Sequence, residues 1–116
     1  MKKDKLGELS LKLADLCEHL SKDLKANREY NYSDQIKRCS SSICANIGEA
    51  SHPQSIKDMI SKFEIALKEA FETDKWLKMI FNANLISKDE LDLIDKIAIK
   101  IRVLLIASVK TLKSKL

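Results

Sequence analysis

The chain has 116 residues, which suits one domain with its own buried core and needs neither disulfides nor a structural metal. Only two Gly and one Pro occur, while 45% of the residues are hydrophobic and 33% are charged. So few turn residues argue against an all-β fold, and so much apolar surface argues against intrinsic disorder. A net charge of +4 is weak grounds for a nucleic-acid partner by itself.

Targeting and cysteine chemistry leave little signal. No apolar run approaches the roughly 20 residues of a membrane span, and Met1 to Lys5 leads into an amphipathic pattern, so we expect a cytoplasmic protein with no membrane partner. Cys17, Cys39 and Cys44 lack C-x-x-C spacing and fall on or near apolar stripes. We interpret them as small buried side chains without a metal or disulfide role.

The N-terminal half contains two amphipathic segments. Leucines recur at three- and four-residue steps from Leu6 to Leu24, which predicts a helix over about 4–26. Ser33 is a plausible N-cap and predicts a second helix over about 33–50.

The second segment is rich in small residues, among them Ser40, Ala45 and Gly48, which predicts that a neighbouring helix approaches it closely. A third helix, over about 53–84, is predicted to start at Pro53, because proline disfavours a helical residue before it and suits a first helical turn.

A last helix is predicted over about 88–115, because Ser87 and Glu90 form an S-x-x-E capping box ahead of a periodic apolar run. Short connections make successive helices antiparallel, so we predict one all-α domain over 1–116, an up-down-up-down four-helix bundle.

The third and fourth helices carry more apolar residues than one core face needs. Single exposed apolar residues are ordinary, but two extra stripes on one small domain favour a homo-oligomer. Six residues form the predicted oligomer interface: Ile65, Trp76, Met79, Ile99, Val103 and Ile106.

Asp74 interrupts the apolar stripe of the third helix between Ala70 and Leu77. A carboxylate there is costly unless it is paired, so we expect a hydroxyl or a basic group of a neighbouring helix as its partner, with Ser40 as the leading candidate. A ligand-binding role for Asp74 is the alternative, and neither role is catalytic.

Basic residues accumulate after Asp95, beyond which no acidic residue occurs. These cations either complement the dipole of the last helix or contact phosphate. The candidate nucleic-acid-binding residues are Arg38, Lys96, Lys100, Arg102, Lys110 and Lys113.

Catalytic patterns are lacking. The paired E-x-x-H motifs of di-iron bundles, the H-E-x-x-H motif and a Gly-rich phosphate loop do not occur, and His52 before Pro53 is interpreted as a loop residue. We therefore expect no enzyme, no metal and no cofactor.

The segment DQIKRCSSSICANIGEAS resembles the pattern Q-x-x-R-A-x-x-S-I-x-x-N-I-A-E-G of the bacterial four-helix bundle proteins, also called 23S rRNA intervening-sequence proteins. The downstream segment FEIALKEAFETDKWL is similar to a second family motif through Phe63, Glu72 and Leu77. The matching residues of the first motif are Gln35, Arg38, Ser42, Ile43, Asn46, Ile47 and Glu49.

This resemblance implies an up-down bundle in a ring-like homopentamer without known catalytic activity. It also implies a link to nucleic acid, because some members are encoded within ribosomal RNA insertions and the related accessory variability determinants of diversity-generating retroelements associate with a reverse transcriptase. Ala50 replaces the usual Gly after Glu49, and Gly48 replaces the usual Ala, so close-packed contacts can differ from those of typical members.

The sequence thus leads to one hypothesis and one rival. The first is a homo-oligomeric bundle that contacts RNA or DNA through a basic surface, as accessory subunit of a reverse transcriptase. The alternative is a structural or protein-interaction scaffold with no nucleic-acid role.

Overall fold

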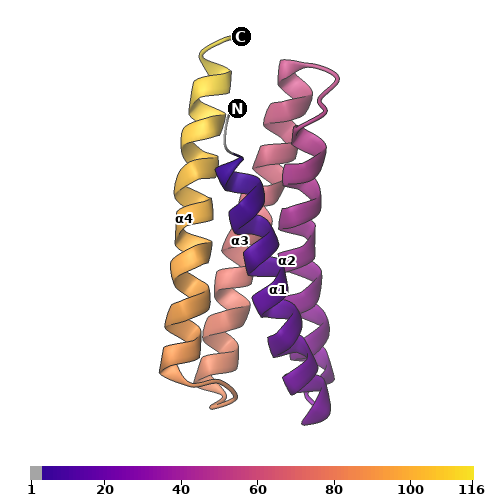
Figure 1. Cartoon of the computed structure of the whole chain (residues 1–116), viewed down its shortest axis with the longest axis vertical. Helices are drawn as coiled ribbons and strands as arrows, with labels where there is room; N and C mark the ends of the chain where they lie inside the picture. The colour runs from indigo at the N-terminus through magenta and orange to yellow at the C-terminus, as the bar shows by residue number, and fades with distance from the viewer. Residues whose placement is uncertain (1–3) are drawn as a thin grey trace.

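The computed structural model describes residues 4–116, and within that range the chain forms four helices and no strand (Figure 1). They are α1 (Lys5–Ala26), α2 (Tyr30–Ala50), α3 (Ile56–Asn82) and α4 (Lys88–Lys113). Each helix packs against the next, and α4 closes the bundle against α1. The bundle is antiparallel and measures 47 × 25 × 22 Å, which confirms the predicted all-α four-helix architecture.

The core is built from one apolar stripe of each helix. Leu13, Ile43, Leu77 and Ile101, one from each, are all fully buried. The α1–α4 face is the least extensively packed of the four, whereas α2 has extensive contacts with both α1 and α3. Nowhere between residues 4 and 116 does a helix have the length and apolarity needed to cross a membrane.

Two helices begin within one residue of the predicted start, and a side chain caps each of them. The carboxylate of Asp4 accepts a hydrogen bond of 2.8 Å from the backbone N–H of Gly7, at the start of α1. The Ser87 hydroxyl accepts one of 3.1 Å from the N–H of Glu90, as the predicted N-cap of α4. Each cap satisfies a backbone donor that the helix itself leaves free.

The other two helices begin elsewhere than expected. α2 starts at Tyr30, and Ser33 lies buried inside it, where its hydroxyl donates a 2.8 Å hydrogen bond to the backbone oxygen of Ser21 on α1. Ser33 is therefore an inter-helix contact and not an N-cap. α3 starts three residues later than expected, at Ile56, with Ser55 as its N-cap.

The α1–α2 turn uses a residue that seldom takes the left-handed conformation. Arg28 has a φ of 62°, and the next N–H, that of Glu29, donates to the backbone oxygen of Leu24 at 2.8 Å. This is a Schellman motif, which usually has glycine at the position of Arg28. Asn84 ends α3 in the same way.

The small residues of α2 do not all serve close packing. Ser40 is buried, but Ala45 and Gly48 are exposed. A Cβ added at Gly48 would meet nothing within 4 Å. The predicted close approach of a neighbouring helix is therefore wrong at Ala45 and Gly48 within one chain.

Candidate interaction surface

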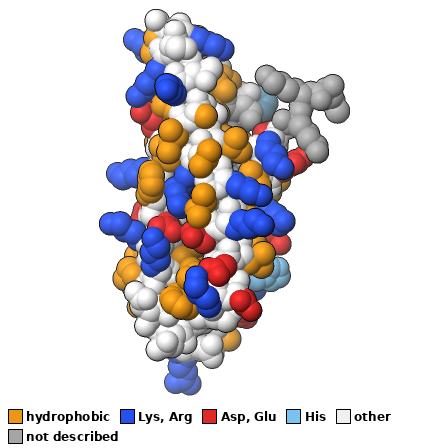
Figure 2. Space-filling view, turned by 90° about the vertical axis from the view of Figure 1, so that its left-hand side faces the viewer, with side chains coloured by type: hydrophobic (Ala, Val, Ile, Leu, Met, Phe, Trp, Pro, Cys, Tyr) orange, Lys and Arg blue, Asp and Glu red, His pale blue; other side chains and the backbone are white. Residues whose placement is uncertain are grey.

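An apolar ridge runs along the outer face of α4. Ile99, Val103 and Ile106 are 43%, 60% and 50% exposed, and we call these three residues the α4 ridge. Figure 2, which looks onto α4, shows hydrophobic side chains along the middle of this face with lysines and arginines on both sides. The ridge points away from the core stripe of α4, so the chain alone does not bury it.

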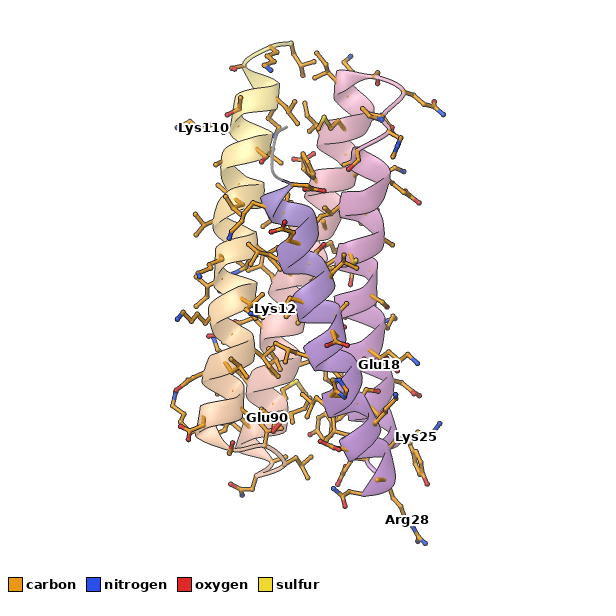
Figure 3. All side chains as sticks on the ribbon, in the orientation of Figure 1. Lys12, Glu18, Lys25, Arg28, Glu90 and Lys110 are labelled. Atoms are coloured by element: carbon orange, nitrogen blue, oxygen red, sulfur yellow. The ribbon has the colours of Figure 1, made fainter. Side chains whose placement is uncertain are left out.

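Three lysines lie beside this ridge or just beyond its end. Lys96, Lys100 and Lys110 are exposed, and none forms an ion pair with an acidic residue within 4–116. Figure 3 shows Lys110 pointing away from the bundle. These three side chains are therefore available to a partner.

Two other predicted phosphate contacts are already engaged. Nη1 of Arg102 lies 3.9 Å from Oδ1 of Asp74, and its guanidinium lies 5.5 Å from the centre of the Phe71 ring. Lys113 pairs with Glu64 on α3 at 3.2 Å. Both cations hold α4 against α3 and are less available to a ligand than the three lysines.

Arg38 is likewise held within the bundle. Its Nη1 lies 3.2 Å from Oε2 of Glu69, and its Nη2 forms a second, short contact with Glu72. Its Nε donates to Oε1 of Gln35 at 3.1 Å, while the indole N–H of Trp76 donates to Glu72 at 3.4 Å. The guanidinium thus bridges α2 and α3, which is a structural use of a predicted phosphate contact.

Asp74 is sheltered as predicted, but its partner is not Ser40. Its side chain is 16% exposed, with Nζ of Lys78 at 2.9 Å and Arg102 on α4 as the second cation. The Ser40 hydroxyl instead donates to the backbone oxygen of Lys37 on its own helix. Asp74 faces α4 and not α2, so Ser40 is the wrong candidate, and the partner on a neighbouring helix is the basic group of Arg102.

A second carboxylate, that of Asp95, belongs to the same cluster. Burial raises the pKa of Asp95, and the neighbouring Asp74 raises it further. Burial alone would also raise the pKa of Asp74, but its hydrogen bonds to Lys78 and Asp95 and the nearby cations lower it overall. The two acids therefore titrate as an unequal pair.

The apolar residues predicted to leave the core of α3 divide into two kinds. Ile65 and Met79 are 42% and 46% exposed. Trp76 is half-buried and packs edge-on against Tyr32 of α2, with ring centres 6.2 Å apart. Trp76 therefore has a contact within the chain, which the helical period of the sequence could not indicate.

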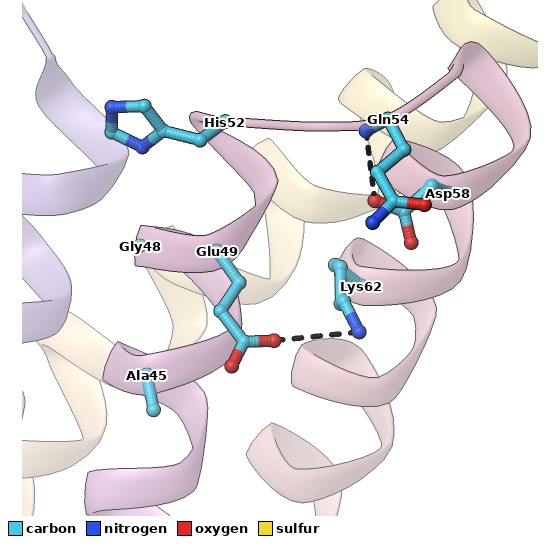
Figure 4. Close-up of a pocket in the computed structure, with 7 residues that line it drawn as sticks. All are labelled: Ala45, Gly48, Glu49, His52, Gln54, Asp58 and Lys62. Atoms are coloured by element: carbon cyan, nitrogen blue, oxygen red, sulfur yellow. Dashed lines mark hydrogen bonds and ion pairs between the residues drawn. The ribbon is translucent and has the colours of Figure 1, made fainter.

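A pocket at the α2–α3 turn contains a single E-x-x-H spacing, from Glu49 to His52 (Figure 4). Glu49 points to Lys62, 3.4 Å away, while the His52 ring points away from both. Across residues 4–116 no three His, Cys, Asp or Glu side chains gather in a group that could hold a metal. This pocket shows no arrangement for catalysis.

A model of the 23S rRNA-intervening sequence protein family matches residues 2–107. The chain belongs to this family. A crystal structure described as a protein of unknown function from the S23 ribosomal protein family, from Bacteroides thetaiotaomicron VPI-5482, is 38% identical with a TM-score of 0.87. The match covers 90% of this chain and 98% of that one. No curated protein matches.

In this member of the 23S rRNA-intervening sequence family, the polar residues of the α2 motif contact the chain itself. Besides Arg38, the amide of Asn46 donates to the backbone oxygen of Ser42 at 2.9 Å, and Glu49 pairs with Lys62. The motif therefore stabilises α2 and its contact with α3. The sequence alone located this motif but did not reveal these partners.

Proposed function

We propose that this protein is a non-catalytic helical subunit that assembles with further copies of itself through the α4 ridge. The observation that carries the proposal is the exposure of Ile99, Val103 and Ile106 on one continuous helix face. Burying such a ridge removes apolar surface from water, and a second copy of the chain is always present at the same concentration.

The test is the mass of the protein in solution. Changing Val103 and Ile106 to Glu places charges in the contact, so we expect an oligomer to dissociate while circular dichroism shows the same helicity. The matched control changes Ile56 and Leu93 to Glu, because these residues are 41% and 52% exposed but lie outside the ridge. An unchanged mass for the ridge variant in light scattering contradicts the proposal.

A second role, binding of RNA or DNA, is favoured by the unpaired Lys96, Lys100 and Lys110. The family description, which refers to 23S rRNA, supports the same partner class. A repeated weak cationic patch gains avidity in an oligomer. The further role of accessory subunit to a reverse transcriptase is supported by the resemblance of the α2 motif.

A variant in which Lys96, Lys100 and Lys110 are all changed to Glu tests this role. We expect lost retention of structured RNA by this variant, and a steep fall of wild-type affinity with salt. The control reverses Lys22, Lys68 and Lys75, which are also exposed. Unchanged RNA binding contradicts a phosphate contact by these lysines, and loss of the oligomer assigns them to the subunit contact.

A further inference from the structure

A hollow on the outside of the bundle between α1 and α2 offers a second apolar surface. Leu11, Cys44, Ile47 and Gly48 line this α1–α2 hollow, and Asp4 and Glu8 stand at its edge. The side chain of Leu11 is 65% exposed, and the missing side chain of Gly48 leaves the floor open.

The rim of the hollow is acidic where the α4 ridge is basic. On α1, four carboxylates fall within about 80° of one another around Leu11, at 100° per residue. They are Asp4, Glu8, Asp15 and Glu18, of which Glu18 already pairs with Lys37 of α2 at 3.6 Å. Lys12 is turned by about 100° from Leu11, and Lys5 lies beside Ile99, so both lie toward α4 and away from the hollow.

We infer that the α4 ridge of one copy seats in the α1–α2 hollow of the next copy, a head-to-tail contact. This inference rests on the self-assembly proposed above and names the surface that the ridge meets. It joins apolar residues at the centre to opposite charges at the edge, as specific interfaces do.

The alternative contact, ridge against ridge across a two-fold axis, is electrostatically poor. It would bring Lys96, Lys100 and Lys110 of one copy against the same lysines of another. Like charges set against each other across an interface disfavour that contact. The carboxylates of the hollow provide the opposite charge that the ridge lacks.

The two surfaces also lie at the same height along the bundle. Leu9 shares one groove with Ile99 and Val103, and Asp4 lines an opening with Ala107 and Thr111. Because α1 and α4 are antiparallel, moving along α1 from Leu9 toward its C-terminal end means moving back along α4.

This common height places opposite charges level with each other. Six residues beyond Leu9, Asp15 is level with the part of α4 that holds Lys96, and Asp4 is level with Lys110. A rotation about an axis parallel to the bundle then brings ridge and hollow together without a shift along that axis. A contact without such a shift does not extend into a helical filament.

The experiment reverses the acidic side of the contact. In Glu8→Lys with Asp15→Lys, the hollow repels the lysines of the ridge, and we expect the dissociation constant of the oligomer to rise about tenfold or more. Asp4 stays unchanged because it caps α1. The control, Asp23→Lys with Asp34→Lys, makes the same charge change at two exposed residues outside the hollow.

A rescue variant adds Lys96→Glu and Lys100→Glu to the reversed hollow, which restores opposite charges in every contact and should restore the wild-type mass. Wild-type protein that is monomeric overturns the proposed self-assembly itself. Two results overturn only the assignment of the hollow. In the first, the wild-type protein is an oligomer and the ridge variant dissociates, but the variant with the reversed hollow does not. In the second, the rescue variant does not recover the wild-type mass.

Discussion

Asp74 on α3 and Arg102 on α4 face each other with Oδ1 and Nη1 3.9 Å apart and with side chains only 16% and 17% exposed. Nη1 of Arg102 and Oδ1 of the adjacent Asp95 are buried without a hydrogen-bond partner among residues 4–116. Asp95 is thus the less well compensated of the two carboxylates. Buried, imperfectly paired charges of this kind weaken a fold.

Asp95→Asn should therefore stabilise the protein, and more so at neutral pH. A carboxyl group whose pKa is raised by folding holds its proton more tightly in the folded chain, so stability falls as pH rises through the window above the ordinary Asp range. The amide carries no charge and removes this loss. We expect a melting temperature a few degrees higher at pH 7, with a smaller gain near pH 4.

The matched control for this prediction is Asp34→Asn on the exposed face of α2. It should change the melting temperature little at either pH. An equal gain from Asp95→Asn at both pH values would falsify the assignment of the effect to ionised Asp95.

Arg38→Gln should destabilise the protein modestly. The substitution removes the cation that lies between Glu69 and Glu72, but the Arg38 side chain is 47% exposed and water screens its ion pairs. We expect a loss of about 0.5–1 kcal/mol in urea unfolding, shrinking in high salt.

Lys37→Gln is the control for the salt dependence, because Lys37 has one exposed ion pair, 3.6 Å from Glu18. Its loss should be smaller than that of the arginine variant. A salt-independent loss at Arg38 would instead indicate that packing of its aliphatic stem, and not the ion pairs, holds α2 to α3.

Arg28→Gly should stabilise the α1–α2 turn. The φ of 62° at Arg28 is costly for a residue with a Cβ and free of that cost for glycine. Glycine also raises the conformational entropy of the unfolded chain, which offsets part of the gain. We expect a net gain of about 0.5–1 kcal/mol in urea unfolding, while Arg28→Ala gains nothing. Equal stability of the Gly and Ala variants argues against left-handed strain at this position.

The fold was predictable because helical periods and caps are local. The expected ranges 4–26 and 88–115 lie within two residues of α1 and α4, because leucine spacing and the Ser87 cap act within single turns. The start of α2 was missed because Ser33 resembles an N-cap in sequence. In the structure its hydroxyl is instead hydrogen-bonded to Ser21 on α1.

The candidate surface was less predictable, because partners on other helices depend on how each helix is rotated in the bundle. The fully buried position of α3 near Asp74 is Thr73, one residue away, which turns Asp74 toward α4 and away from Ser40. Likewise the sequence shows that Arg38 is a cation but not that Glu69 and Glu72 lie across from it. The α4 ridge was predictable because its exposure follows from one helical period.

The three cysteines should differ sharply in reactivity. Burial raises the pKa of Cys17 to about 12, with a hydrogen bond to Ser40 acting against the rise, and burial also raises the pKa of Cys39. Only the thiolate reacts with alkylating reagents, so neither Cys17 nor Cys39 should react in the folded protein at pH 8. Cys44 is only half-buried and should react.

Alkylation followed by intact mass measurement checks this prediction. We expect one adduct per chain in buffer, none in Cys44→Ser, and three per wild-type chain in strong denaturant. Cys44 also lines the α1–α2 hollow, so its alkylation should slow when the chain assembles through that surface. Modification of Cys17 or Cys39 in buffer at the rate of Cys44 would show that the α1–α2 core opens far more readily than its full burial of both thiols implies.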